Sequence, residues 1–292
     1  MERKQLNLVL LIAIIGISFA APLIKLGLQL GVHPTAIAFY RLLLASLILL
    51  FPLIKNKGYQ QYRTLAVRDR SIGFLSGLFL AMHFICWINS LSLTSTFAST
   101  ALVATPPLFI TIGAYFIFGE RPKRRALVGG FIALIGIVIL CFNTFGQAEN
   151  LWGNGLALLG SIFMAFYLLC NKHLRKNLDN IPMTFLVYAS SSIILLLVAI
   201  GTDVPLFAYS FPAYLVLLAL AILSTLCGHA LLNLALKHTD ASVVSTCLLI
   251  EPLGAALLSL LFFQEVPSIY TVLGSLIVLA GVFWFNHHNQ KA

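Results

Sequence analysis

The 292-residue sequence is 60% hydrophobic and only 9% charged, with a mean hydropathy of +0.98 and a formal net charge of +9. Soluble domains carry roughly 25% charged residues, so this composition excludes a soluble globular protein and predicts a chain that folds within a lipid bilayer. The basic residues lie mainly in loops, where they indicate membrane orientation, and we expect no nucleic-acid partner.

The first apolar segment follows Glu2-Arg3-Lys4 and runs over Leu6–Leu30. Its beginning resembles a signal peptide, with Ser18-Phe19-Ala20 in the place of a cleavage site. Because the apolar residues continue well beyond that point, we expect an uncleaved first transmembrane helix.

Loops or helix breakers divide the chain into ten apolar stretches, each close to the roughly 20 residues that cross the hydrocarbon core. We therefore predict an all-α polytopic membrane protein with ten transmembrane helices. Three prolines inside spans are helix-break candidates, since they free backbone carbonyls that protein or a cavity must satisfy: Pro22, Pro107 and Pro252. The predicted spans are Leu6–Leu30, Pro34–Ile54, Ser71–Leu93, Phe97–Phe118, Arg125–Phe142, Trp152–Leu174, Ile181–Ile200, Pro212–Leu236, Ala241–Phe263 and Ile269–Phe285.

Lysine and arginine occur almost entirely in one set of loops, which holds 16 of the 18 basic residues. The other set holds none, and carries Glu149, Asp203 and Glu265 instead. Because positive loops stay on the cytoplasmic side, we expect both termini in the cytoplasm and a bacterial-type inner membrane as the location.

A block of proline, glycine and glutamate residues occurs twice, with 145 positions between equivalent residues. The chain thus divides into halves of five spans, residues 1–147 and 148–292, and an odd number of spans makes the repeat inverted. Repeat symmetry explains the glutamate pair economically, so we leave both glutamates out of the candidate site. The equivalent pairs are Pro107 and Pro252, Glu120 and Glu265, Pro122 and Pro267, Gly129 and Gly274, and Gly136 and Gly281.

With Gly119 added to the first block, these motifs resemble the drug/metabolite transporter superfamily, and the EamA-domain exporters most closely. Gln264 replaces the usual glycine of the second block, while Arg41 in Tyr40-Arg41-Leu42-Leu43 fits the second helix of the family. The resemblance implies a secondary transporter with alternating access, acting as a monomer or weak homodimer and needing no cofactor. Members of the family export amino acids, other metabolites and drugs, so the substrate stays open.

Ionisable groups inside a bilayer are costly and are candidates for function. Glu251 lies near the middle of the ninth span, where it could bind a substrate amine, carry a coupling proton or fix the break at Pro252. Arg41 could hold a substrate carboxylate or lock two helices together. Lys25 points outward along its helix in this interpretation, and extension of its head to the membrane interface is the alternative to a functional role.

Two polar pairs lie one helical turn apart. His83 and Trp87 suit a pocket that stacks an aromatic or cationic ligand, or else a hydrogen-bonded core histidine beside a packing tryptophan. His229 and Asn233 suit an interhelical hydrogen bond or the same cavity. Tyr167 is a further candidate for the cavity wall.

The first, third, fourth, sixth, eighth and ninth helices are the predicted cavity walls. The five cysteines lie in or beside apolar runs without CxxC spacing, so we expect neither disulfides nor a metal site.

The favoured function is export of small metabolites, with amino acids as the substrate class, and the alternative is export of drugs or cationic metabolites. An intramembrane enzyme is remote because the sequence lacks HExxH, paired membrane aspartates and GxSxG. An ion channel is remote because nothing resembles a selectivity filter or a charged ring.

Overall fold

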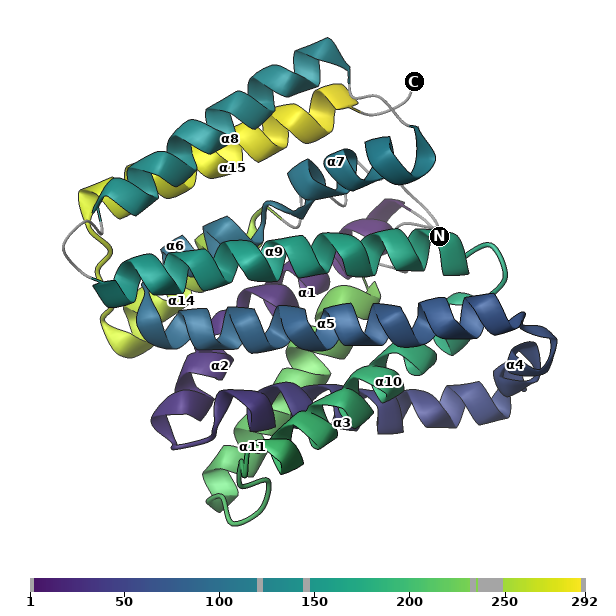
Figure 1. Ribbon diagram of the computed structural model, residues 1–292. Coiled ribbons are helices and arrows are strands. Elements are labelled where there is room, and N and C mark those ends of the chain that lie inside the picture. The colour runs from purple at the N-terminus through teal and green to yellow at the C-terminus, as the bar shows by residue number, and fades with distance from the viewer. Residues whose placement is uncertain (1–2, 120–122, 144–147, 232–234, 236–248, 290–292) are drawn as a thin grey trace.

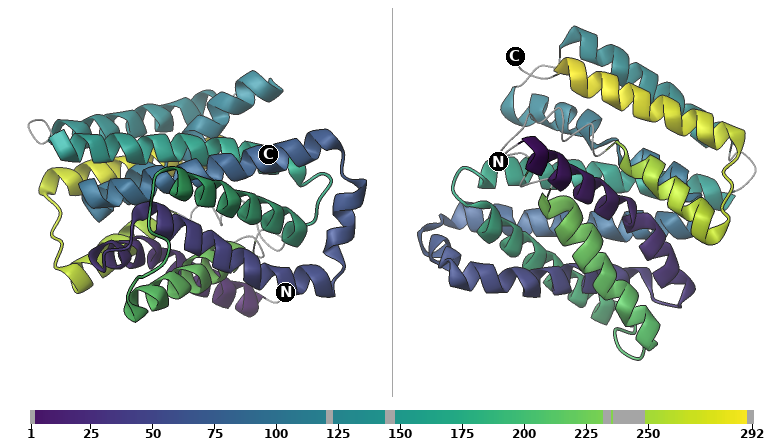
Figure 2. Two further views of the ribbon diagram at one scale, coloured as in Figure 1. Left: turned by 60° about the horizontal axis from the view of Figure 1, so that its bottom comes forward. Right: turned by 180° about the vertical axis from the view of Figure 1, so that it is seen from behind.

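The chain folds into a bundle of helices, seen in a computed structural model (Figures 1 and 2) that describes residues 3–119, 123–143, 148–231, 235 and 249–289. No strand occurs in these ranges. The main elements are α1 (Arg3–Ser18), α2 (Ala20–Gln29), α3 (Pro34–Lys55), η1 (Gly58–Gln60), α4 (Gln61–Thr64), α5 (Val67–Leu93), α6 (Thr96–Val103), α7 (Pro106–Phe118), α8 (Arg124–Asn143), α9 (Ala148–Leu174), α10 (Asn180–Gly201), α11 (Phe211–Ala219), η2 (Leu220–Ala230), α14 (Glu251–Phe263) and α15 (Ile269–Asn289).

Eight helical segments of the described chain are long and apolar enough to cross a membrane. This count differs from the ten predicted spans at two places. Helix α8 is not among the eight. The predicted span Ala241–Phe263 is described from Leu249 onward, and α14 begins there at Glu251 and has 13 residues. Such a helix is shorter than the roughly 20 residues of a full crossing.

Two predicted spans are interrupted inside the bundle, and a helix begins within a third. The first span divides at Phe19, between α1 and α2 and three residues before Pro22. The fourth divides between Val103 and Pro106, and α7 carries Pro107 as its second residue. Helix α14 begins at Glu251 with Pro252 next, and Pro106 and Glu251 are 145 positions apart. Equivalent positions of the two sequence blocks thus begin a helix.

Local sequence signals explain where other helices begin. His33 precedes α3 and its Nδ1 accepts a hydrogen bond from Thr35 N, while Pro34 occupies a position that needs no N–H donor. Ser95 and Ser210 cap α6 and α11 in the same manner by accepting from the backbone three residues later. These caps fix the starts of helices at one end of the bundle.

Helices α8 and α15 pack along their length at one edge of the bundle (Figures 1 and 2). A Cβ on Gly129 would lie 2.6 Å from Gly281 O, and one on Gly136 would lie 2.7 Å from Gly274 O. The pairing runs in opposite directions along the two helices, so they are antiparallel. Glycine is therefore required here because the two backbones touch.

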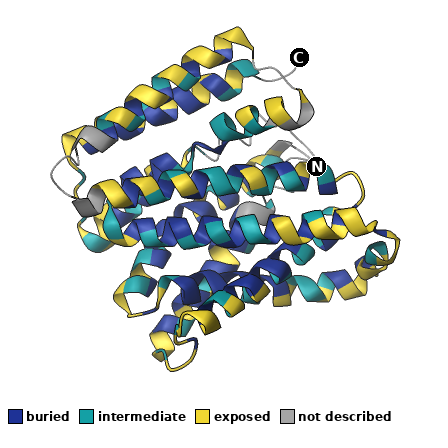
Figure 3. Ribbon diagram, viewed as in Figure 1, coloured by how far each residue is buried: buried dark blue, intermediate teal, exposed yellow. Residues whose placement is uncertain are grey.

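The main apolar core lies among α2, α3, α5, α10 and α11. Large apolar side chains also face outward, among them Phe131 on α8, Leu197 on α10 and Phe262 on α14. Exposed residues cover the outward faces of the helices in Figure 3. A surface of this kind suits lipid rather than water as the surrounding solvent.

Candidate functional site

Arg41 on α3 is fully buried, with 0% of its surface exposed. Its Nε donates to Thr225 Oγ1 and its Nη2 donates to Ser224 Oγ, both at 2.8 Å. The guanidinium also lies over the ring of Phe84, 4.6 Å from the ring centre. A buried guanidinium needs such partners because it stays charged, and here they come from both halves of the chain.

The element that supplies Ser224 and Thr225 is the π-helix η2. Thr225 Oγ1 donates in turn to Leu220 O at 3.2 Å, within the same element. Helices of this type are rare and occur frequently at functional sites. The local widening of η2 presents two neighbouring hydroxyls to one arginine.

Two buried donors, one on this arginine and one on a neighbouring tryptophan, have no hydrogen-bond partner among the residues that the structure describes. They are Arg41 Nη1 and Trp87 Nε1. The Arg41 guanidinium carbon lies 5.9 Å from the centre of the Trp87 ring, and Trp87 is only 3% exposed. Buried polar groups are nearly always paired, so two neighbouring exceptions mark this place as unusual.

Glu251 is the first residue of α14 and is partly buried. A carboxylate at this position is favoured by the positive end of the helix dipole. Glu251 and Arg41 interact electrostatically but form no direct ion pair. An acidic and a basic group from the two sequence halves thus interact across the bundle without a direct contact.

His83 lies in a packed position rather than in an open pocket. Its Nδ1 is 3.0 Å from Gly160 O on α9, and its ring stacks on Trp87 at 5.7 Å between centres. Tyr167 packs against the main core beside Asn171 and Tyr188. Both side chains therefore hold α5 and α9 to their neighbours.

A cavity of about 520 Å³ lies next to the arginine, at the end of the bundle where α3 leads into α4. Tyr188 and Thr225 belong to its lining, and both interact with Arg41. Among the described residues, the eighth predicted span, through its η2 part, is the one of the six predicted wall helices that lines this cavity. The other lining residues come from α3, the turn after it, η1, α4, the residue before α10, α10 and η2: Leu49, Pro52, Leu53, Asn56, Gly58, Gln61, Asp179, Asn180, Ile181, Pro182, Thr184 and Leu226.

Polar contacts between the halves border the mouth of this cavity. Gln61 Nε2 donates to Asp179 Oδ2 at 2.6 Å, and Asp179 N donates back to Gln61 Oε1 at 2.9 Å. Tyr62 donates its hydroxyl to Pro182 O at 2.7 Å, and burial raises the pKa of Tyr62. The mouth is thus lined by neutral donors and one carboxylate.

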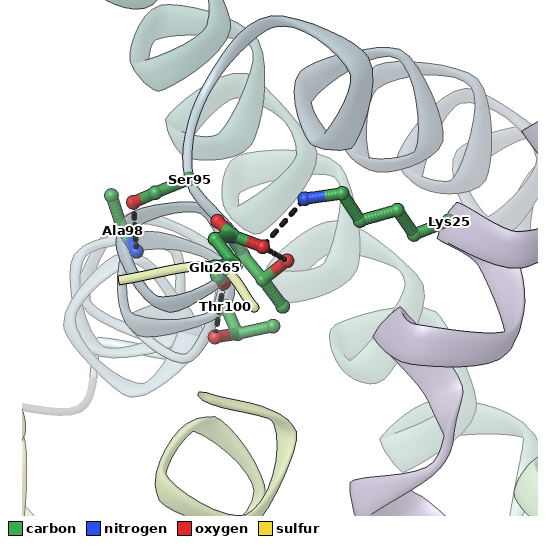
Figure 4. A network of polar contacts seen from close by, with 6 residues as sticks. Lys25, Ser95, Ala98, Thr100 and Glu265 are labelled. Atoms are coloured by element: carbon green, nitrogen blue, oxygen red, sulfur yellow. Dashed lines mark hydrogen bonds and ion pairs between the residues drawn. The ribbon is translucent and has the colours of Figure 1, made fainter. Parts of the chain in front are cut away.

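Lys25 and Glu265 meet at the opposite end of the bundle. Lys25 Nζ lies 2.5 Å from Glu265 Oε2, and Figure 4 shows the lysine reaching from α2 toward the carboxylate. Glu265 also accepts from Thr96 N and Thr96 Oγ1, both at 2.7 Å. Lys25 thus pairs with a carboxylate that lies 240 residues further along the chain.

Some of the sequence candidates cannot be placed. The side chain of His229 and the whole of Asn233 lie outside the described residues. No group of three or more His, Cys, Asp or Glu residues in the described ranges could hold a metal ion.

Sequence reasoning missed Ser224, Thr225 and Tyr188. Two adjacent hydroxyl residues in the middle of an apolar span were a usable signal, since polar side chains in a membrane usually face the bundle interior. Nothing in the sequence linked that pair to Arg41.

This fold defines a multi-pass helical membrane protein. Residues 5–142 and 151–286 each match the EamA-like transporter family, so the chain belongs to that family and is a membrane transporter.

Relatives extend along most of the chain. An uncharacterized transporter of Archaeoglobus fulgidus is 25% identical over 265 residues, which cover 89% of this chain and 90% of the relative. The inner membrane protein YtfF of Escherichia coli K12 is 28% identical over 255 residues, covering 77% and 78%. One solved crystal structure of a protein resembles the whole chain with a TM-score of 0.66 and 16% identity, covering 100% of both chains, which shows the fold alone.

Proposed function

We propose that this transporter is a secondary exporter of small metabolites, that amino acids are its substrate class, and that it works by alternating access. The observation that carries the substrate class is the relationship of Arg41 and Glu251. They are a basic and an acidic group from the two sequence halves that interact electrostatically without a direct ion pair, and Thr225, a hydrogen-bond partner of Arg41, lines the cavity. A zwitterion offers a carboxylate to the arginine and an amine to the glutamate.

The proposed architecture is ten membrane helices in two inverted five-helix repeats, residues 1–147 and 148–292. Three observations on pairs of positions 145 residues apart support it. Helices begin at Pro106 and at Glu251, and left-handed backbone occurs at Gly119 and at Gln264. The third support is the reciprocal contact of α8 with α15, in which Gly129 and Gly136 face the glycines equivalent to Gly136 and Gly129.

The proposed orientation places both termini in the cytoplasm of an inner-membrane protein that is a monomer or weak homodimer. It is supported by the basic loops, since the turn carrying Lys55 and Lys57 lies at the cavity end of the bundle. The described conformation is then open toward the cytoplasm. The contact of Lys25 with Glu265 closes the external end, as alternating access requires of one end at a time.

The test is counterflow in liposomes with the purified protein. The panel contains labelled amino acids and cationic drugs, and Glu251→Gln and Arg41→Gln are run beside the wild type. We expect amino acids to exchange and both variants to lose that exchange. If only cations move and Arg41→Gln behaves as the wild type, the drug or cationic-metabolite exporter replaces this proposal. If nothing in the panel moves, the proposed substrate class is wrong.

A further inference from the structure

The two unpartnered donors beside Arg41 point to a specific ligand group. We propose that Arg41 Nη1–H and Trp87 Nε1–H together form a subsite for the carboxylate of the transported compound. This inference rests on the proposed export of small metabolites. It specifies which atoms of the protein bind the substrate and which chemical group of the substrate they bind. Leaving a buried donor without a partner is unfavourable, and more so when the donor is charged, so binding an acceptor there recovers that free energy.

The surroundings of Arg41 satisfy two of its three guanidinium nitrogens and leave Nη1 without a hydrogen-bond partner among the described residues. The hydroxyls of Thr225 and Ser224 occupy Nε and Nη2, each at 2.8 Å. Phe84 covers one face of the guanidinium. These partners are neutral, so they orient the positive charge without cancelling it, and an anion at Nη1 would complete the pairing.

The ring of Trp87 is held in place by stacking on its face, and its N–H takes no part in holding it. The ring stacks on His83 at 5.7 Å between centres with 29° between planes, and His83 is itself held by Gly160 O. The indole N–H can only donate a hydrogen bond, so its partner must be an acceptor. In this proposal Trp87 donates a hydrogen bond to the ligand, whereas its spacing from His83 predicted either stacking on a ligand or packing in the core.

These two donors select a carboxylate over its neutral derivatives. A carboxylate has two oxygens that only accept, and it can take a hydrogen bond from each residue while neutralising the arginine. A primary amide has one oxygen and an NH₂ group, which would face a donor without a partner. Thr225 and Tyr188 line the cavity and also adjoin Arg41, so the ligand reaches the subsite from the cavity end.

The decisive comparison uses amino acids and their amides. Trp87→Phe removes the N–H but retains an aromatic ring, and Trp152→Phe is the matched control because Trp152 is 71% exposed on α9. We expect wild-type counterflow to prefer each acid over its amide. Trp87→Phe should raise the half-saturation concentration for the acid about tenfold, leave that for the amide unchanged, and so remove the preference. Trp152→Phe should behave as the wild type.

A binding measurement separates this subsite from the transport proposal. Acids and amides are added to the purified protein in detergent, and the apparent melting temperature is followed for wild type, Trp87→Phe and Arg41→Lys. We expect stabilisation of the wild type by the acids, less in Trp87→Phe and none in Arg41→Lys. Equal stabilisation by acid and amide, or none by either, would overturn the subsite. Selective stabilisation without counterflow would overturn the transport proposal and leave the subsite standing.

Discussion

Lys25 Nζ lies 2.5 Å from Glu265 Oε2, and this ion pair joins residues 240 positions apart. The side chains are 22% and 18% exposed, so solvent weakens the attraction and the pair contributes about 1 kcal/mol at most. The pair matters more for the segments that it joins than for the free energy that it contributes. It connects α2 with the segment before α15, and the same carboxylate accepts from the first residue of α6.

The first prediction concerns opening of this end. Lys25→Met retains the aliphatic stem but removes the charge, and a loss of about 1 kcal/mol raises the open fraction about fivefold. Ser259 lies with Thr96 and Glu265 around a small pocket, so Ser259→Cys in a cysteine-free background reports the opening. The measurement is the rate of labelling by a membrane-impermeant maleimide added from the outside. Lys57→Met, at the cavity end, should not change the rate, and an unchanged rate in Lys25→Met would contradict the prediction.

The second prediction concerns the contact of α8 with α15. Gly129→Ala would place its Cβ 2.4 Å from Phe285 N, so the two backbones must separate. We expect a loss of about 1–3 kcal/mol, as for overpacked cores, and a lower apparent melting temperature in detergent. Gly130→Ala is the neighbouring control, because its Cβ would meet no atom closer than 3.7 Å. Similar losses in both variants would mean that helix propensity, not this contact, sets the requirement for glycine.

The third prediction concerns two residues with positive φ. Gln264 has a φ of 53° and ends α14, while Gly119 has a φ of 68° at the equivalent position. A side chain in this region costs roughly 1–2 kcal/mol. We expect Gln264→Gly to raise the apparent melting temperature and Gly119→Gln to lower it, although a Cβ at Gly119 would have open space around it. A fall in both variants would show that the Gln264 side chain contributes more than its backbone costs.

The fourth prediction concerns the support of Arg41. Thr225→Val keeps the shape of the side chain but removes the acceptor of Arg41 Nε, so a further buried donor loses its partner. We expect a stability loss of about 1–3 kcal/mol and a clear loss of substrate exchange. Thr225→Ser keeps the hydroxyl and should retain most exchange. If the valine and serine variants exchange equally well, the threonine hydroxyl does not position the arginine.

Composition and the lengths of the apolar runs were sufficient to predict the helical membrane fold, and the resemblance of the repeated motifs indicated the family. The apolar runs located most helices, and the glycine spacing pointed to residues that prove to be backbone contacts between α8 and α15. The exact position of the break at Phe19 was harder to predict. Pro22 disrupts the helical hydrogen bonds of the turn that precedes it but does not determine which residue of that turn leaves the helix.

The polar contacts between distant segments could not be predicted from one sequence. Arg41 and Glu251 stood out because charges are rare in apolar spans, but the partners of Arg41 are two ordinary hydroxyls. Glu265 was left out of the candidate site on grounds of symmetry, yet it binds Lys25 and the start of α6. Repeat symmetry explains why a residue type recurs and says nothing of which side chain meets it.

The glycine contact between α8 and α15 has a consequence for how such a chain can be assembled. Each half offers the other the same two glycines at the same spacing, so the surface is self-complementary. A shorter chain carrying a single copy of it could associate with an antiparallel copy of itself. Joining the halves in one polypeptide then raises their effective concentration without adding a contact. Residues 1–147 and 148–292, made as separate polypeptides in one membrane, would meet through these same glycines.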